Sequence, residues 1–209
     1  MKAIGRIQCI TAPRSDGDMA AQAARLCGAG LDWLQFRMKA GRRRERLEHG
    51  RQVSDVCRSY GATFMVNDDI ELAARLGADG VHLGLQDEDP AAARRILGSQ
   101  AIIGGTCNTM EDIRLRHRQG VNYIGLGPYR FTSTKQHLSP LLGLQGIEEI
   151  LRYCRLEKIT IPIVAIGGIR REDVAELRKV GVHGIAVSSL LIDTTEPADL
   201  LNEIMEKLE

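Results

Sequence analysis

The sequence predicts an α/β protein that folds as a single (β/α)8 barrel, or TIM barrel, over residues 1–209. Short apolar runs bounded by Gly, Asn or Asp alternate with longer stretches whose apolar residues repeat at helical spacing, eight of each. Several helical stretches end in a glycine-containing turn just before the next apolar run, as at Gly120 and Gly181. Eight successive strand–helix units form a parallel sheet that closes naturally into a barrel, with an open doubly wound sheet as the alternative.

The elements follow one another along the chain without a linker or a shift in composition. The apolar runs predict strands near residues 4–11, 33–37, 63–66, 80–83, 101–104, 123–126, 162–165 and 184–187. The helical spacing predicts helices near residues 19–28, 46–60, 70–76, 90–97, 110–119, 144–155, 171–180 and 197–207. Asp69, Asp89 followed by Pro90, and Thr109 are the expected N-caps of three of these helices.

The composition excludes several classes of function. Hydrophobic residues make up 44% of the chain and charged residues 26%, which is ordinary for a globular protein. The net charge is +1 and only 4% of residues are aromatic, so we expect no nucleic-acid partner. The basic run 42–44 is interpreted as a solvated loop because no aromatic residues interleave it.

The cysteines and the N-terminal segment predict a cytoplasmic protein without a membrane partner. The five cysteines are irregularly spaced and contain no C-x-x-C pair, so we interpret them as reduced, buried thiols, with Cys107 the one nearest the predicted site. The first 13 residues lack the apolar core of a secretory signal, and no apolar run reaches membrane-spanning length.

A barrel of this class places its reactive groups at the carboxyl ends of its strands. The second predicted strand ends in alternating Gln35, Arg37 and Lys39, which would face the barrel mouth together. Two fixed cations suit a diphosphate, although an exposed strand end with snorkelling side chains is the alternative.

Two acidic turns follow the third and fourth predicted strands. Asp69 and Asp89 are accounted for as N-caps, which leaves Asp68, beside Asn67, and Asp87 unassigned. Neighbouring barrel loops bring such carboxylates together, and oxygen ligands of this kind favour Mg²⁺. No Cys/His cluster suggests zinc.

The remaining strand ends carry hydroxyls and glycines. Paired glycines before Thr106 would allow the backbone close to a ligand, and a hydroxyl-rich loop at 132–135 looks like a phosphate grip. The Ile-Gly-Gly run ending at Gly168 and the Ser188-Ser189 pair occupy the loops that often bind phosphate in this fold. His82 and His183 are interpreted as structural histidines.

Taken in order, these strand ends resemble the thiamine-phosphate synthase family and its paralogues, the thiazole tautomerases. The resemblance spans nearly the entire chain. Its motifs are Gln35-Phe36-Arg37-Met38-Lys39, Val66-Asn67-Asp68-Asp69, His82-Leu83-Gly84 with Asp87, Gly104-Gly105-Thr106, Gly125-Leu126-Gly127-Pro128 leading to Thr132-Ser133-Thr134-Lys135, and Ala165-Ile166-Gly167-Gly168-Ile169.

The resemblance implies an enzyme that condenses hydroxymethylpyrimidine diphosphate with a thiazole phosphate, or its carboxylate, and releases pyrophosphate. The implied ligands of the pyrimidine diphosphate are Gln35, Arg37, Lys39, Asn67, Thr106 and Lys135, and those of Mg²⁺ are Asp68 and Asp87. The implied ligands of the thiazole phosphate are Thr132, Ser133, Thr134, Gly168, Ser188 and Ser189. Catalysis then consists of a dissociative displacement in which Mg²⁺, Arg37, Lys39 and Lys135 neutralise the departing pyrophosphate.

The chain departs from the family pattern at a few positions. Met38 stands where many members carry Glu, and Thr106 replaces Ser while keeping the hydroxyl. Asn108 stands where a His is frequent, and because Asn cannot titrate, it favours the synthase over the tautomerase, which uses a histidine there. A thiazole tautomerase and a non-catalytic barrel that binds phosphate ligands remain the alternatives, and the sequence leaves open whether the chain forms a homo-oligomer.

Overall fold

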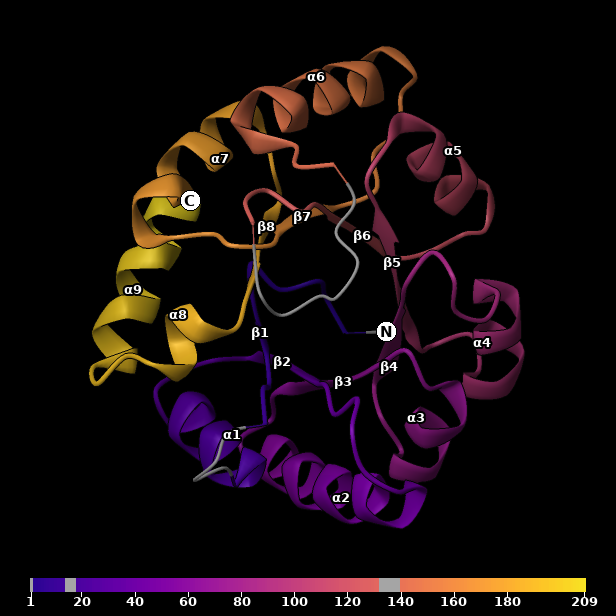
Figure 1. The fold of residues 1–209 in the computed structure, drawn as a ribbon, viewed down its shortest axis with the longest axis vertical. Coiled ribbons are helices and arrows are strands. Elements are labelled where there is room, and N and C mark those ends of the chain that lie inside the picture. Colours follow the sequence, from indigo (N-terminus) through magenta and orange to yellow (C-terminus); the bar gives the residue numbers. More distant parts are fainter. Residues whose placement is uncertain (1, 14–17, 132–139) are drawn as a thin grey trace.

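The computed structural model describes residues 2–13, 18–131 and 140–209, and these form a closed barrel of eight parallel strands. The strands follow one another around the barrel in chain order, and β1 pairs with β8 to close it. The helices form a ring around the strands (Figure 1). The predicted TIM barrel is therefore confirmed, and the open doubly wound sheet is excluded.

The strands agree closely with those expected from the apolar runs. They are β1 (Ile7–Ile10), β2 (Trp33–Phe36), β3 (Thr63–Asn67), β4 (Gly80–Leu83), β5 (Ile102–Cys107), β6 (Tyr123–Leu126), β7 (Ile163–Ile166) and β8 (Gly184–Val187). The first strand is shorter than expected, and β5 runs three residues further, through the glycine pair to Cys107.

The helices include two short elements that the sequence did not predict as separate helices, η1 and α8. They are α1 (Met19–Gly28), α2 (Arg43–Ser59), α3 (Ile70–Leu76), α4 (Pro90–Leu97), α5 (Met110–Arg118), α6 (Gly143–Leu156), the 3-10 helix η1 (Arg171–Asp173), α7 (Val174–Val180), α8 (Ser189–Ile192) and α9 (Pro197–Leu208). The unpredicted α8 directly follows β8, and it begins at one of the two serines assigned to phosphate.

The beginnings of the helices follow local hydrogen bonds. Asp69, Asp89 and Thr109 each accept a backbone N–H with the side chain, which confirms all three predicted N-caps. Helix α2 begins earlier than expected because the Glu45 carboxylate accepts the backbone N–H of Arg42 at 2.9 Å. The expected loop at 42–44 is therefore wrong: the run is exposed, but it starts a helix.

The inside of the barrel has its own cluster of side chains, separate from the core between strands and helices. Trp33 and Tyr123 meet there edge to face with ring centroids 4.9 Å apart. Gln8, Gln35 and His82 are also buried. Alternate residues of each strand point inward in this fold, so a polar layer lies beneath the mouth of the barrel.

All five cysteines are free and buried, as expected. Burial raises the pKa of the Cys107 thiol, so this cysteine is an inert core residue. Within the described part of the chain, no helix is long and apolar enough to cross a membrane.

Candidate active site

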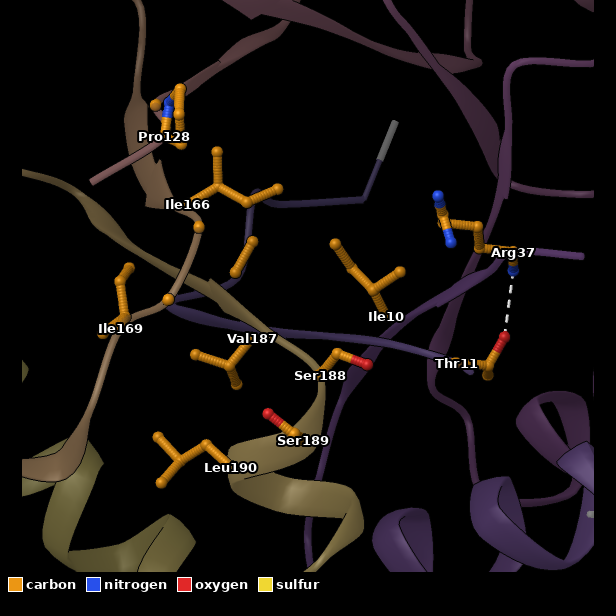
Figure 2. Close-up of a pocket in the computed structure, with 14 residues that line it drawn as sticks. Ile10, Thr11, Arg37, Pro128, Ile166, Ile169, Val187, Ser188, Ser189 and Leu190 are labelled. Carbon is orange, nitrogen blue, oxygen red and sulfur yellow. Dashed lines mark hydrogen bonds between the residues drawn. The ribbon is translucent and has the colours of Figure 1, made fainter. Parts of the chain in front are cut away.

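A pocket opens at the carboxyl ends of strands β1, β2, β6, β7 and β8, where this fold places its active sites. Its lining includes Arg37, Gly168, Ser188 and Ser189 from the predicted site. It also includes residues that the sequence analysis gave only as parts of motifs, which are Gly127, Pro128, Ile166, Gly167 and Ile169. Residues that the sequence analysis did not assign to the site complete the lining: Ile10, Thr11, Ala186, Val187 and Leu190. Figure 2 shows the Arg37 guanidinium on one side of this pocket and the apolar side chains of Ile166 and Ile169 on the other. The pocket thus combines a cation, hydroxyls and an apolar wall.

Arg37 provides the cationic side of the pocket. Its backbone N–H donates to the Thr11 hydroxyl at 2.9 Å, which ties the end of β2 to the end of β1 (Figure 2). Burial lowers the pKa of the guanidinium, and the nearby Asp68 charge opposes this effect. An arginine that is partly desolvated binds a phosphate more strongly than one surrounded by water.

Asp68 lies next to this cation, at the end of β3. It adopts a left-handed backbone conformation, with φ 66°, and its N–H donates to the His82 carbonyl at 2.8 Å. Lys39 Nζ lies 3.4 Å from Asp68 Oδ2. Burial, followed by the neighbouring Asp87 carboxylate, raises the pKa of Asp68. A cation bound beside this half-buried carboxylate and its neighbour Asp87 would therefore be stabilised.

Asp87 is held by its own loop. Its Oδ2 accepts the backbone N–H of Gly84 at 2.6 Å, which bends the loop after β4 back toward the barrel. Among the residues that the structure describes, no group of three or more His, Cys, Asp and Glu side chains is placed to hold a metal ion. The Asp68–Asp87 pair instead suits an ion such as Mg²⁺, which binds one or two carboxylates and shares its other ligands with phosphates and water.

A buried arginine that the sequence did not predict as a site residue, Arg116, holds the Asp87 loop by a hydrogen bond to its backbone. Arg116 is only 4% exposed, and it donates to the Gly84 carbonyl at 2.6 Å and to Gln119 Oε1 at 3.0 Å. Gln119 in turn donates to Asp89 at 3.2 Å, beyond Asp87. Arg116 follows the buried Ile113 by three residues, so an arginine on the apolar face of a predicted helix was the available signal.

Thr106 ends a chain of hydrogen bonds inside the barrel. Its hydroxyl lies 3.0 Å from His82 Nε2, and His82 Nδ1 lies 2.9 Å from the Tyr123 hydroxyl. Gln8 Nε2 donates to Tyr123 at 3.1 Å, and Gln35 Nε2 donates to Gln8 Oε1 at 2.9 Å. His82 is therefore satisfied as expected. Gln35 points into the barrel, but it is only 1% exposed and lies in the buried layer beneath the mouth.

The glycines before Thr106 make room for side chains of the barrel itself. A Cβ at Gly104 would lie 2.3 Å from the Tyr123 ring and 2.5 Å from His82 Nδ1. A Cβ at Gly105 would lie 2.9 Å from Arg116 Cδ. The interpretation that these glycines admit a ligand is thus replaced by a packing role.

The opposite side of the pocket is built from the ends of β7 and β8. Gly167 and Gly168 have positive φ angles of 97° and 65°, which expose backbone groups toward the pocket. Ser188 and Ser189 lie at the start of α8, and their hydroxyls border the pocket (Figure 2). Loops after the last two strands together with a short extra helix are the usual phosphate site of this fold.

Arg130 connects the loops that follow β6 and β7, and the sequence reading did not single it out. It donates to the Gly168 carbonyl at 2.8 Å and forms a two-pronged ion pair with Asp173, at 2.7 and 2.9 Å. Its guanidinium lowers the pKa of Asp173, which is 8% exposed. Asp173 thus holds Arg130 in the position from which it binds the Gly168 carbonyl.

Asn108 has a structural task in this arrangement. It is buried, and its amide donates to the carbonyls of Gly127 at 2.9 Å and Pro140 at 3.0 Å, which bracket the β6 loop. Asn108 therefore places a neutral amide, and not an ionisable side chain, at this position beside Gly127.

The structure brings the predicted residues into three groups. Arg37 shares one pocket with Gly168, Ser188 and Ser189; Lys39, Asp68 and Asp87 lie together; and Thr106 joins the buried chain. Asn67 ends β3, half-buried beside Asp68. The predicted ligands Thr132, Ser133, Thr134 and Lys135 lie outside the described residues.

Known proteins resemble this chain in sequence and in structure. Residues 7–191 match the family model described as thiamine monophosphate synthase. The thiamine-phosphate synthase of Flavobacterium johnsoniae is 42% identical over 203 residues, which cover 97% of this chain and 96% of that protein. The enzyme of the same name from Flavobacterium psychrophilum is 45% identical, over 86% of this chain and 87% of its own.

A solved structure extends the agreement to the fold. The thiamine phosphate pyrophosphorylase from Pyrococcus furiosus is 29% identical, with a TM-score of 0.84 over 98% of this chain and 97% of its own. A 3-hexulose-6-phosphate synthase at 14% identity, with a TM-score of 0.66 over 98% of this chain and 100% of its own, shares the fold alone. The chain therefore belongs to the thiamine monophosphate synthase family.

Proposed function

We propose that this chain is a thiamine-phosphate synthase, a transferase of thiamine biosynthesis that joins hydroxymethylpyrimidine diphosphate to a hydroxyethylthiazole phosphate and releases pyrophosphate. The observation that carries the proposal is one pocket with a cation on one side and a phosphate-type turn on the other, beside a carboxylate pair. Two relatives with this name match 97% and 86% of the chain. Both substrates are small phosphorylated molecules.

The diphosphate would bind where cations and carboxylates meet. Arg37 and Lys39 approach this point from β2, and we assign Lys135 and Asn67 to the same ligand on the family motif. Asp68 and Asp87 fit Mg²⁺ because burial, and then the neighbouring Asp87 carboxylate, raises the pKa of Asp68, and a bound cation would offset both effects. When bound, Mg²⁺ would neutralise part of the diphosphate charge.

The thiazole phosphate would bind at the turn of β7 and the start of α8. Gly168 supplies backbone groups, and Ser188 and Ser189 supply hydroxyls at a helix beginning. We assign Thr132, Ser133 and Thr134 to the same phosphate on the family motif. The apolar Ile166 and Ile169 would then face the uncharged rings of the substrates.

The protein contributes positioning and charge compensation. The bond between the pyrimidine methylene carbon and the diphosphate oxygen breaks, and its electron pair leaves with pyrophosphate. The lone pair of the thiazole nitrogen then forms the new bond to that carbon. Arg37, Lys39 and Lys135 compensate the charge that grows on the leaving group, and the two binding sides align the reactants. No covalent nucleophile is required.

One property of the chain and one expected test result bear on the alternatives. A tautomerase acting on the thiazole phosphate alone needs a proton-transfer group, whereas Asn108 is neutral and engaged with two carbonyls. A non-catalytic barrel would bind its ligands equally well without Asp68 and Asp87. A cytoplasmic location is supported by the five free thiols.

Incubation of the protein with both substrates and Mg²⁺ tests the proposal. We expect equal amounts of pyrophosphate and thiamine phosphate, and loss of both in a D87N variant. Folded wild-type protein that turns over the thiazole phosphate without the pyrimidine partner, or that turns over neither, would contradict it.

A further inference from the structure

A continuous chain of hydrogen bonds crosses the inside of the barrel from β2 to β5. It connects five side chains in the order Gln35, Gln8, Tyr123, His82 and Thr106, with steps of 2.9, 3.1, 2.9 and 3.0 Å. All but Thr106 are buried, and Thr106 is half-buried at the upper end. These hydrogen bonds therefore end at the Thr106 hydroxyl, which the family motif assigns to the diphosphate.

The neighbouring strands are shaped around the middle of this chain. A Cβ at Gly104 would meet both Tyr123 and His82, and a Cβ at Gly125 would lie 2.9 Å from His82 Cε1. These two glycines within β5 and β6 thus leave the space that the Tyr123 and His82 rings occupy. Such close packing fixes the ring orientation, so the hydrogen-bond partners of its two nitrogens are also fixed.

When His82 is neutral and the Tyr123 hydroxyl donates within this network, two orders of donors and acceptors are possible. In the first, Gln8 donates to Tyr123, Tyr123 donates to His82 Nδ1, and His82 Nε2–H donates to Thr106. In the second, every bond is reversed through amide flips of Gln8 and Gln35, and Thr106 donates to His82. The first leaves the Thr106 hydroxyl hydrogen free for a ligand, whereas the second leaves only lone pairs, which repel an anion.

We propose that the hydrogen bonds follow the first order, in which each side chain from Gln35 to His82 donates to the next. His82 is then held as the Nε2–H tautomer, and the Thr106 hydroxyl is free to donate a hydrogen bond to the diphosphate. Tyr123 and His82 are then positioning residues, which act through the orientation of one hydroxyl. The inference rests on the proposed function because an anion at Thr106 is what selects the direction. It assigns a role to the buried tyrosine and histidine that their packing alone does not require.

Nitrogen NMR of protein labelled at its five histidines, recorded with inorganic pyrophosphate and Mg²⁺ bound, tests the direction without any turnover. We expect His82 to be neutral, with Nε2 protonated and Nδ1 unprotonated. His183 provides an internal reference, because its Nε2 lies 3.0 Å from the Ile4 carbonyl, which only accepts hydrogen bonds. The His82 signals are those absent from an H82N variant or, if that variant does not fold, those displaced in T106V. A proton on Nδ1 would overturn the proposal.

Substitutions separate the donor role from packing. Tyr123→Phe keeps the ring and removes the hydroxyl, and we expect it to mix the two His82 tautomers and lower kcat/KM for the pyrimidine diphosphate about tenfold. Thr106→Val should lower it about 100-fold and Thr106→Ser less than about threefold. The KM for the thiazole phosphate should stay within about twofold in all three. Tyr153→Phe on α6, a tyrosine that is 38% exposed, is the matched control.

Binding of inorganic pyrophosphate with Mg²⁺, measured by calorimetry, distinguishes failure of this inference from failure of the proposed function. T106V and Y123F should both bind pyrophosphate more weakly than Y153F, even if the wild-type protein releases no product. Equal affinity in all four proteins, or an unchanged His82 signal in folded Y123F, would contradict the inference while leaving the synthase activity intact.

Discussion

Lys39 Nζ lies 3.4 Å from Oδ2 of Asp68, at the point where the ends of β2 and β3 meet. The lysine is 60% exposed, so this ion pair contributes little to stability by itself. Its significance is that a cation balances a carboxylate whose pKa is already raised by burial and by Asp87. In the proposed enzyme, Asp68 would bind the metal and Lys39 the diphosphate, so the two groups would exchange partners when these ligands bind.

The raised pKa of Asp68 predicts how its removal changes stability. A carboxyl whose folded pKa exceeds its unfolded value stabilises the protein below the unfolded pKa, and this contribution is lost as pH rises through the folded pKa. At neutral pH, without metal, Asp68→Asn should therefore raise the Tm by about 2 °C. Calorimetric scans with and without Mg²⁺ measure this, and Asp55→Asn on the exposed face of α2 is the control.

Mg²⁺ should reverse the order of Tm between the wild type and the Asp68→Asn variant. Wild-type Tm should increase with Mg²⁺ concentration, because ligand binding stabilises the folded state, whereas D68N should not respond. A D68N variant that is stabilised by Mg²⁺ as much as the wild type would remove Asp68 from the metal site.

Arg116 is expected to set the metal affinity through the Asp87 loop. Arg116→Met leaves the Gly84 carbonyl and Gln119 without their donor, so we expect about 2 kcal/mol lower stability and about tenfold weaker activation by Mg²⁺. The KM for the thiazole phosphate should not change. Arg118→Met, on the exposed face of the same helix, is the matched control for kinetics with varied Mg²⁺. Loss of stability with unchanged Mg²⁺ dependence would reduce Arg116 to a packing role.

The Arg130–Asp173 pair should govern the thiazole phosphate side. Arg130→Met removes the donor to the Gly168 carbonyl, and we expect the KM for the thiazole phosphate to rise about tenfold with little change in Mg²⁺ activation. Arg170→Met, at an exposed arginine 3.9 Å from Glu172, is the control. Equal KM values in the two variants would contradict this assignment.

The same pair predicts a pH dependence of stability. Arg130 lowers the pKa of Asp173 in the folded protein. The ion pair therefore stabilises the folded state above the unfolded pKa of the carboxyl, and this stabilisation is lost as pH falls through the folded pKa. Denaturant unfolding should show R130M less stable than wild type at neutral pH, with the difference shrinking in acid. A difference that does not depend on pH would argue against the ion pair as its cause.

Gly168 should tolerate no side chain. Its φ of 65° is strained for any other residue, and a Cβ would lie 2.8 Å from the Phe131 carbonyl. Gly168→Ala should therefore raise the KM for the thiazole phosphate at least tenfold, measured beside Gly61→Ala. Gly61 also has a positive φ, but a Cβ there meets nothing within 4 Å. A similar KM in the two variants would show that the turn does not bind the phosphate.

Much of this structure could be predicted from the sequence because its signals are local. Alternation of apolar runs and helical stretches gave the barrel, and Asp69, Asp89 and Thr109 were recognised as N-caps from their immediate neighbours. Because Asp69 and Asp89 are N-caps, the candidate metal ligands in the two acidic turns are Asp68 and Asp87, which follow the adjacent strands β3 and β4.

The features that escaped prediction depend on contacts between distant parts of the chain. Arg116 and Gly84 are 32 positions apart, and Arg130 and Asp173 are 43 apart. Gly104 looked like a ligand contact because nothing local reveals that Tyr123 and His82 need its space. Gln35 alternates correctly with Arg37, but only the closed barrel shows that one turns to Gln8 while the other reaches the pocket.

The central claim is that one rim of this barrel joins two phosphorylated substrates by expelling pyrophosphate. The most direct measurement is simultaneous quantification of pyrophosphate and thiamine phosphate formed from both substrates, with and without Mg²⁺, in wild type and in a D68N/D87N double variant. The account predicts a one-to-one ratio in the wild type that depends on Mg²⁺ and is lost in the double variant. Product formation by the double variant at the wild-type rate, or no product from folded wild-type protein, would contradict it.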